Sequence, residues 1–206
     1  MQPIDFWFSI GSTYTYLSVM RLPEVVRLTG QPFRWRPFDV RRVMLEQNNI
    51  PFRDKPVKLA YMWRDLDRRA AARGLAPSIP APYPLANLTF ANEVALLGMR
   101  EGWGEAYVTE TYRRWFERGE AAGDAANLSG ALLAIGQDPE RVRRAASRSE
   151  IAQALATETD TARDLGVFGS PSFVVAGEVV WGDDRLEDAL DWARVGAIRH
   201  LAGEAH

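Results

Sequence analysis

GVFGSPSFVVAGEVVWGDDRLED, residues 166–188, is the stretch of this sequence that says most about the fold. It holds two short runs of apolar and β-branched residues, 172–177 and 178–182, which meet near Gly177. Runs of this length around a glycine-containing turn are typical of a β-hairpin. The stretch therefore predicts two neighbouring strands close to the end of the chain.

The residues on either side of this hairpin carry signals of their own. Pro171 stands directly before the first strand, and proline cannot donate a hydrogen bond to a ladder. An ordinary edge-strand start would explain it, and so would a special turn with a cis peptide bond, the rarer of the two. After the hairpin, Asp183 or Asp184 can cap a final helix over residues 183–201.

The start of the chain predicts a second unit of alternating structure. Residues 4–10 are aromatic and β-branched and read as a strand, and residues 32–38 read as another. Between them, residues 13–29 have helical spacing of apolar positions, with Pro23 predicting a kink or a break. A strand, a helix and a strand in this space make a βαβ unit with a parallel pair of strands.

The middle of the chain, residues 40–166, is rich in alanine, arginine, glutamate and leucine. Its apolar residues recur at helical spacing, and prolines between residues 76 and 87 predict a rigid extended loop. The order of elements therefore predicts one sheet interrupted by an all-helical insertion. The expected helices cover residues 56–73, 88–101, 105–120, 128–135, 139–147 and 149–165.

The composition excludes several kinds of chemistry. The 206 residues include no cysteine, and the two histidines, His200 and His206, lie in the C-terminal tail. Disulfides, CxxC redox chemistry and thiolate metal sites are thereby excluded, and we expect neither a metal nor a Ser-His-Asp triad. With a net charge of −2, no long apolar run and no signal peptide, we expect a cytoplasmic protein without a nucleic-acid or membrane partner.

Three stretches together resemble two related groups, the 2-hydroxychromene-2-carboxylate isomerases and the kappa-class glutathione transferases. These stretches are FWFSIGSTYTYL (6–17), NNIPFRDKPVKLAYMWRDL (48–66) and residues 166–188. The resemblance covers essentially the full length, and its third stretch is the most specific.

This resemblance implies an α/β protein with a DsbA-like, thioredoxin-like fold, βαβ then ββα, interrupted by a large all-helical insertion. The thioredoxin-like domain would comprise residues 1–39 and 167–206. The inserted helical domain would comprise residues 40–166.

Ser12 stands where cysteine-bearing thioredoxin relatives carry their nucleophile, after the first strand and before the first helix. The resemblance implies that glutathione is the cofactor and supplies the thiol, and that Ser12 is the catalytic residue that donates a hydrogen bond to its thiolate. A simple helix N-cap is the alternative for Ser12, and the two are compatible. The family usually has proline after this serine, whereas here Thr13 follows, whose hydroxyl could share or replace the function of Ser12.

The other glutathione contacts are carried over from the resemblance alone. The turn before the hairpin would pair with the cysteinyl backbone, as in strand addition. Lys58, helped by Asn49, would hold the glycyl carboxylate as a compact charge. The full set of expected contacts is Asn49, Lys58, Ser170, Pro171, Trp181, Asp183 and Asp184.

Each of these contacts has an ordinary structural alternative. Asp183 and Asp184 would receive the γ-glutamyl end of glutathione, but either can be a helix cap. Trp181 would wall the site, but it can equally be a core aromatic. Lys58 can be an ordinary surface lysine of a first helical turn.

The resemblance implies a glutathione-dependent isomerase that acts by reversible thiolate addition on an aromatic substrate of the 2-hydroxychromene-2-carboxylate or hydroxybenzylidenepyruvate type. A kappa-like transferase or peroxidase would use the same site and release a conjugate or oxidised glutathione. A non-catalytic module that binds glutathione or a peptide is the third possibility. The relatives are often dimers, so a homodimer is possible.

Two further groups of residues remain. The run RDLDRRAAAR (64–73) indicates a solvated helix face with arginine–aspartate pairs in preference to a nucleic-acid patch. Several aromatic residues are candidates for a second-substrate pocket, although most are expected in the core. They are Trp63, Tyr83, Phe90, Trp115 and Phe116, with the loop at Tyr83 and Pro84 beside them.

Overall fold

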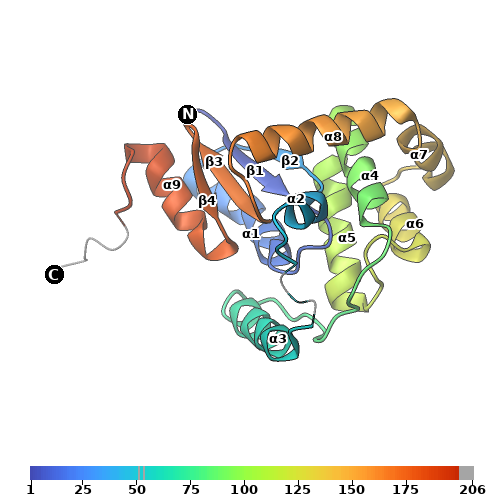
Figure 1. Ribbon diagram of the computed structural model, residues 1–206, viewed down its shortest axis with the longest axis horizontal. Coiled ribbons are helices and arrows are strands. Elements are labelled where there is room, and N and C mark those ends of the chain that lie inside the picture. Colours follow the sequence, from blue (N-terminus) through green and yellow to red (C-terminus); the bar gives the residue numbers. More distant parts are fainter. Residues whose placement is uncertain (51, 53, 200–206) are drawn as a thin grey trace.

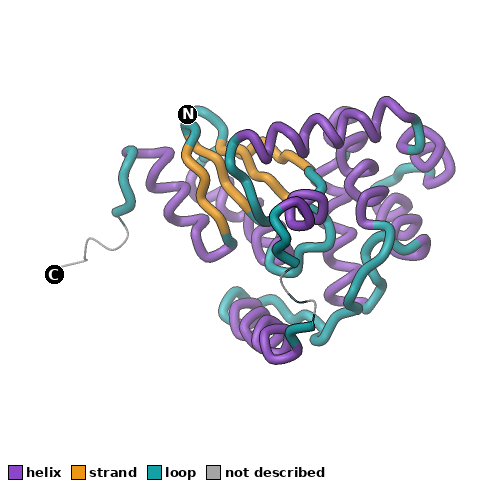
Figure 2. The backbone as a smooth tube through the Cα atoms, viewed as in Figure 1, coloured by secondary structure: helices purple, strands orange, loops and turns teal. Residues whose placement is uncertain are grey.

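A computed structural model of the chain describes residues 1–50, 52 and 54–199. Its centre is one mixed sheet in the order β2-β1-β3-β4, with helices on both faces (Figure 2). The strands are β1 (Ile4–Phe8), β2 (Phe33–Pro37), β3 (Ser172–Val175) and β4 (Glu178–Trp181).

The strand pairing is that of a thioredoxin-like fold. β1 and β2 run parallel and are joined by α1 (Thr15–Thr29), as the βαβ pattern predicted. β3 pairs antiparallel with β1, and β4 pairs antiparallel with β3. The hairpin turn places Ala176 at φ 50° and Gly177 at φ 87°, a left-handed pair that suits the twist of a two-residue hairpin. The predicted hairpin and fold class are confirmed.

The helical block lies between the two halves of the sheet in sequence; in Figure 1, α4, α5, α6 and α7 lie to the right of the sheet and α3 lies below it. Most predicted helices are confirmed to within a few residues, and α2 is an addition that the sequence reading did not contain. The helices are α2 (Val40–Glu46), α3 (Pro56–Ala71), α4 (Leu88–Glu101), α5 (Gly104–Arg118), α6 (Ala125–Ala134), α7 (Pro139–Ala146), α8 (Ser149–Asp164) and α9 (Leu186–Val195).

Two helices, the first and the last, differ in their boundaries from the sequence prediction. α1 begins at Thr15, two residues later than expected, and it runs through Pro23 without the break that was one expectation. A proline removes one hydrogen bond of a helix, and the buried Val19 and Leu22 before Pro23, with the half-buried Val25 after it, keep this helix packed on the core. The last helix is shorter than predicted, because a 3-10 turn, η1 (Asp183–Arg185), precedes α9. Residues 200–206, the end of the predicted terminal domain, lie outside the described residues.

The apolar core has two parts, one on each face of the sheet. The larger part runs without interruption from β1, with Phe6 and Phe8, through α4 and α5 to Leu186 of α9. The smaller part lies between Trp7 and the helices α2 and α8. The sheet and the helical block share one core, and the predicted division into two domains stays a prediction.

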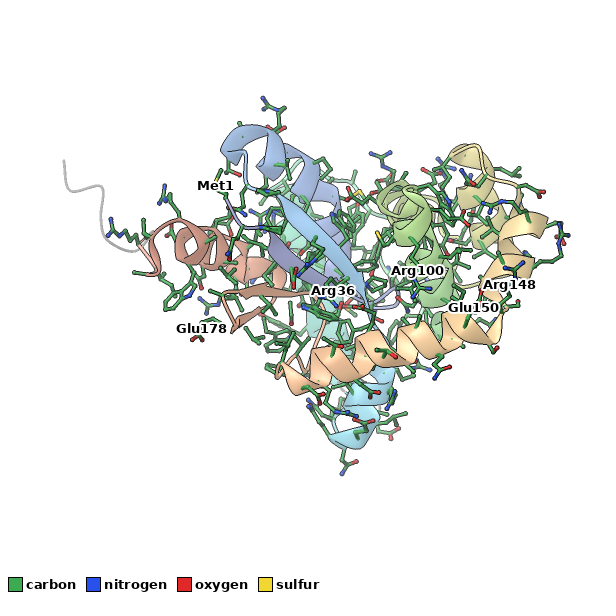
Figure 3. The ribbon with its side chains drawn as sticks, turned by 90° about the horizontal axis from the view of Figure 1, so that it is seen from above. Met1, Arg36, Arg100, Arg148, Glu150 and Glu178 are labelled. Atoms are coloured by element: carbon green, nitrogen blue, oxygen red, sulfur yellow. The ribbon has the colours of Figure 1, made fainter. Side chains whose placement is uncertain are left out.

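Arg36 of β2 ties the second face of the sheet to α8 (Figure 3). Its guanidinium lies 4.3 Å from the ring centroid of Trp7 and pairs with Glu158 of α8 at 2.7 Å. A cation over an indole face is attracted by the negative face of the ring. The covering helix α8 is thus attached to the sheet by charge as well as by apolar contact.

We expect Phe6→Ala to destabilise the fold strongly. The Phe6 ring is fully buried and contacts Trp35 at 4.9 Å and Phe173 at 5.4 Å between ring centroids. Emptying such a site costs about 3–5 kcal/mol in free energy of unfolding, measured by denaturant titration. The control Phe168→Ala removes the same ring from a 39% exposed position and should cost about 1 kcal/mol or less. Equal losses would contradict this account of the core.

Candidate active site

The strand pairing brings three turns to one edge of the sheet. In the antiparallel register, Trp7 at the end of β1 faces Ser172 at the start of β3. The loop that leaves β1 therefore lies beside the turn that enters β3, and the Ser9 N–H donates to Ser170 Oγ at 2.9 Å. Ser172 also faces Trp181 at the end of β4, so the turn after β4 reaches the same edge.

Ser12 meets the Ser170–Pro171 turn directly. Its hydroxyl donates to the carbonyl oxygen of Ser170 at 2.5 Å, and the Ser170–Pro171 peptide bond is cis. Ser12 is partly exposed. Of the two readings of Pro171, the special turn is confirmed.

Ser12 does not cap α1. The helix begins at Thr15, the cap position belongs to Tyr14, and the Ser12 hydroxyl is bonded across to the Ser170 turn instead. The preceding Gly11 has φ 112°, a backbone conformation that glycine adopts without strain, and a Cβ there would also lie 2.6 Å from the Leu88 side chain. The alternative that Ser12 is a helix cap is therefore wrong.

A buried polar network stands behind this turn, and the sequence reading missed it. The hydroxyls of Thr15 and Ser170 share a hydrogen bond of 2.8 Å. The phenol of Tyr112, on α5, reaches the carbonyls of Ser9 at 3.0 Å and Ser12 at 3.1 Å. The side chain of Asn92, on α4, accepts from the Ile10 N–H at 2.8 Å. The helical block thus contributes directly to the turn that carries Ser12.

Trp181 lies at the rim of this edge and is not a core aromatic. Its side chain is exposed, and its ring centroid is 4.9 Å from that of Phe168. The indole covers Gly169, where a Cβ would lie 2.3 Å from the indole nitrogen. Trp181 therefore walls the outer side of the Ser170–Pro171 turn.

Asp183 is turned inward from η1. It is 2% exposed, and its Oδ1 accepts a hydrogen bond from Ser18 of α1 at 2.9 Å. Arg73 pairs with its Oδ2 at 2.8 Å as an ionic contact without hydrogen-bond geometry. Burial raises the pKa of Asp183 above its ordinary value, and the neighbouring Arg73 and Arg21 oppose that rise.

Neither predicted cap is formed. α9 begins after Arg185, and the side chain at that cap position makes no hydrogen bond to the helix N–H groups. The carboxylate of Asp183 is held instead by Ser18 of α1 and by Arg73, which follows the end of α3. The side chain of Asp184 is 50% exposed, and its Oδ2 lies 3.8 Å from the guanidinium of Arg69.

Charged residues of α3 form the other side of the site. Tyr14 and Arg69 both donate to Oδ2 of Asp65, at 3.0 and 2.8 Å. Burial and the hydrogen bond to Asp65 raise the pKa of Tyr14, so its phenol keeps its proton at neutral pH. The solvated-face prediction for residues 64–73 holds for Arg64 and Asp67, which form an exposed pair. It is wrong for the face of α3 that meets α1 and η1.

Lys58 and Asn49 lie further from the Ser12 turn. Lys58 is exposed on the first turn of α3, with its ammonium 5.9 Å from the Phe52 ring centroid. It precedes Asp65 by seven residues, almost two helical turns, so both face the same side of α3 about 10 Å apart. Asn49 is exposed, and its N–H donates to the Met44 carbonyl at 2.8 Å. No described contact joins either residue to Ser12.

The aromatic candidates separate into two sets. Trp115 and Phe116 are fully buried core residues. Trp63 and Tyr83 are half-buried, with ring centroids 6.1 Å apart, and Phe52 lies 6.1 Å from Tyr83. These three rings form a half-buried aromatic cluster between α3 and the proline-rich loop. Phe90 is also half-buried.

Metal and membrane features were searched within residues 1–50, 52 and 54–199. That part of the chain holds no group of three or more histidine, aspartate or glutamate residues placed to bind a metal ion. None of its helices combines the length and apolar character needed to cross a membrane.

Comparison with known proteins gives the class first. A family model described as "DSBA-like thioredoxin domain" matches residues 3–191, and the chain belongs to this family. A probable DsbA oxidoreductase from Streptomyces coelicolor shares the fold at a TM-score of 0.71, with 20% identity over 94% of this chain and 90% of that one.

Within this class, the chain belongs with proteins named 2-hydroxychromene-2-carboxylate isomerase. One from Sphingobium xenophagum is 31% identical over 190 residues, which cover 89% of this chain and 94% of the relative. Another from Pseudomonas putida is 29% identical over 187 residues, 89% of this chain and 90% of the relative. A solved structure of such an isomerase superposes with a TM-score of 0.83 at 27% identity and covers 98% of both chains.

The raised pKa of Asp183 predicts a pH dependence of stability. Between its ordinary pKa of 3.8 and the higher folded value, the folded state binds more protons than the unfolded state. The free energy of unfolding of the wild type, relative to Asp183→Asn, should therefore increase as the pH falls from 7 towards 4. Denaturant titrations of both proteins across this range measure the difference. A difference that shrinks as the pH falls would contradict the buried position of this carboxylate.

Proposed function

We propose that this chain is a glutathione-dependent isomerase for an aromatic 2-hydroxychromene-2-carboxylate or a related hydroxybenzylidenepyruvate. The relatives named for this activity support the reaction class. The observation that carries the proposal is the contact of Ser12 with the Ser170 carbonyl beside cis-Pro171, in a chain that has no cysteine. A hydroxyl at this position suits the binding of an external thiol.

The backbone at Ser170 fits the cysteinyl part of glutathione. The Ser170 N–H has no acceptor among the residues that the structure describes, and its carbonyl accepts only the Ser12 hydroxyl there. A peptide that lies along this turn can accept from that N–H and donate to that carbonyl, as an added strand does. The Ser12 hydroxyl is then released by rotation about one side-chain bond and can turn to the thiol.

The charges around the turn fit the two ends of the tripeptide. The exposed carboxylate of Asp184 and the guanidinium of Arg69 suit the amino and carboxylate groups of the γ-glutamyl end. Lys58, exposed on the first turn of the same helix α3, suits the glycyl carboxylate. Asp183 holds η1 in place and is not free to bind the ligand itself.

The chain's own task is to hold and orient a thiolate. When bound, glutathione would supply a thiolate that adds reversibly to a conjugated carbon, so that a double bond becomes a rotatable single bond until the thiolate leaves. A hydrogen bond from Ser12 stabilises the charged sulfur and keeps more of it ionised at neutral pH. Fixing the thiolate and the substrate in one geometry supplies the rest of the acceleration.

The aromatic cluster of Phe52, Trp63 and Tyr83 suits the ring of the substrate. These rings are half-buried, and they lie beside Lys58 on the α3 side of the site. Burial raises the pKa of Tyr83, so the cluster stays neutral and apolar at physiological pH. An aromatic substrate gains by stacking against such rings.

Ser12, rather than Thr13, is the donor in this proposal. Thr13 is 4% exposed, whereas Ser12 is partly exposed and its hydroxyl already faces the Ser170 turn. Ser12→Ala should lower kcat/KM for isomerisation about 100-fold, the loss typical of one donor to a developing anion. Thr13→Val keeps the shape of the buried side chain and should lower kcat/KM far less.

The two variants are compared by isomerase assays and by the ultraviolet absorbance of bound thiolate. Ser12→Ala should also abolish most of the thiolate signal at neutral pH. A larger loss of kcat/KM in Thr13→Val than in Ser12→Ala would indicate that Thr13 is the donor to the thiolate. Release of a stable conjugate or of oxidised glutathione would point to the transferase or peroxidase chemistry. Binding without a thiolate signal would point to a non-catalytic module.

The chain's two lysines, Lys55 and Lys58, provide a matched pair for the glycyl end. Lys58→Gln should raise the KM for glutathione about tenfold and leave kcat nearly unchanged, because the contact is made equally in the ground and transition states. Lys55→Gln removes the same charge from a lysine that lies near the Ile50 carbonyl, at 3.5 Å, and should change KM by less than about twofold. Equal increases in KM for the two variants would mean that Lys58 acts only through general electrostatic attraction and makes no specific contact.

A further inference from the structure

We infer that Tyr112 is a positioning residue: its hydroxyl, delivered by α5 of the helical block, holds the Ser9–Ser12 turn so that the Ser12 hydroxyl faces the bound thiol. This inference rests on the proposed function for its catalytic consequence. Its structural content concerns the turn itself and can be tested without glutathione.

The phenol of Tyr112 is fixed in place by its surroundings. The residue is fully buried, and its ring packs against Trp115 and Phe116 on the same helix, with centroids 5.7 and 6.4 Å away. Its single proton is shared between the carbonyls of Ser9 at 3.0 Å and Ser12 at 3.1 Å. Burial raises the pKa of Tyr112, so the phenol remains a donor through the whole neutral range.

The Ser12 carbonyl depends on this donor more than the Ser9 carbonyl does. The Ser9 carbonyl also accepts the Ser12 N–H at 3.1 Å, which closes the turn from inside. Among the described residues, the Ser12 carbonyl has the Tyr112 phenol as its donor. This hydrogen bond is partly buried, so a Ser12 carbonyl left without its donor carries a cost of lost hydration, and we expect the turn to shift to recover a donor. Such a shift moves the Ser12 side chain with it.

A second helix holds the other side of the same turn. Asn92 of α4 accepts from the Ile10 N–H at 2.8 Å and donates to the Ile10 carbonyl at 3.2 Å. It also donates to the Leu88 carbonyl of its own helix at 2.8 Å, which fixes its amide. α4 and α5 therefore hold the turn by hydrogen bonds at Ile10 and Ser12, while the Ser170–Pro171 turn contacts it from the sheet side.

Tyr112→Phe is the test, because it removes one hydroxyl and keeps the packed ring. Tyr107→Phe is the matched control. Tyr107 is another fully buried tyrosine of α5, and its hydroxyl donates to the Ala91 carbonyl at 3.4 Å, away from the turn. Both variants lose a buried hydroxyl from the same helix, so effects of general destabilisation are shared.

The first measurement is the pH titration of bound glutathione by thiolate absorbance. We expect Tyr112→Phe to lower the thiolate fraction at neutral pH about two- to tenfold, because the hydrogen bond from Ser12 to the thiolate is weakened. Tyr107→Phe should leave the thiolate fraction unchanged. In a Ser12→Ala background, Tyr112→Phe should have almost no further effect, because its influence passes through Ser12. An undiminished effect there, or an equal effect of Tyr107→Phe, would overturn the inference.

The second measurement separates this inference from the proposed function. Amide hydrogen exchange on the glutathione-free protein should show faster exchange at residues 9–13 in Tyr112→Phe than in either Tyr107→Phe or the wild type. Unchanged protection of these amides would overturn the inference even if glutathione is activated normally. If the wild type binds no glutathione, the proposed function fails, and the exchange result still decides whether Tyr112 holds the turn.

Discussion

The antiparallel pairing of β3 with β1 is the constraint on which the site depends. Because Trp7 faces Ser172, Ser170 lies beside the loop that leaves β1, and the contacts of Ser9 and Ser12 with Ser170 follow. Side chains alternate across a strand, so a slip of one residue would turn Phe173 out of the core and carry Ser170 away from the loop. The stacking of Phe173 on Phe6 secures the register with apolar contact. The core thus determines where the site is.

The helical block does more than lengthen the chain. Its largest buried side chains join the core that contains β1, and two of its polar residues, Asn92 and Tyr112, end at the turn that carries Ser12. At a separate point, Arg69 of α3 and Arg73, two residues past the end of α3, pair with the turn after β4. The edge of the sheet carries the Ser12 and Ser170 turns. The helical block holds the Ser12 turn through Asn92 and Tyr112, and its arginines hold the turn after β4.

Sequence reasoning reached those parts of the molecule that are local or that follow a known pattern. Periodicity gave the strands, the hairpin and most helices, because apolar spacing is a local property. The resemblance led to Ser12 and Ser170, and the structure shows these two residues in contact. Tyr112 and the buried ion pair of Asp183 could not be predicted in the same way: a buried tyrosine on a helix looks like any core residue, and Arg73, which pairs with Asp183, lies far away in the sequence. The spacing of Lys58, Asp65 and Arg69 on one face of α3, with Arg73 four residues further on, was the available signal for that helix.

The absence of cysteine gives the contact between Ser12 and Ser170 a consequence for selectivity. In this structure the Ser12 hydroxyl donates to the Ser170 carbonyl, so in the proposed function it must leave that carbonyl before it can donate to a bound thiol. A peptide N–H beside the thiol makes this possible, because it takes over the Ser170 carbonyl as the hydroxyl turns away. A simple thiol carries no such group and would leave a buried carbonyl without a donor. When the peptide N–H of the ligand bonds to the Ser170 carbonyl, it frees the Ser12 hydroxyl to bond to the sulfur. This coupling favours a cysteinyl peptide over other thiols.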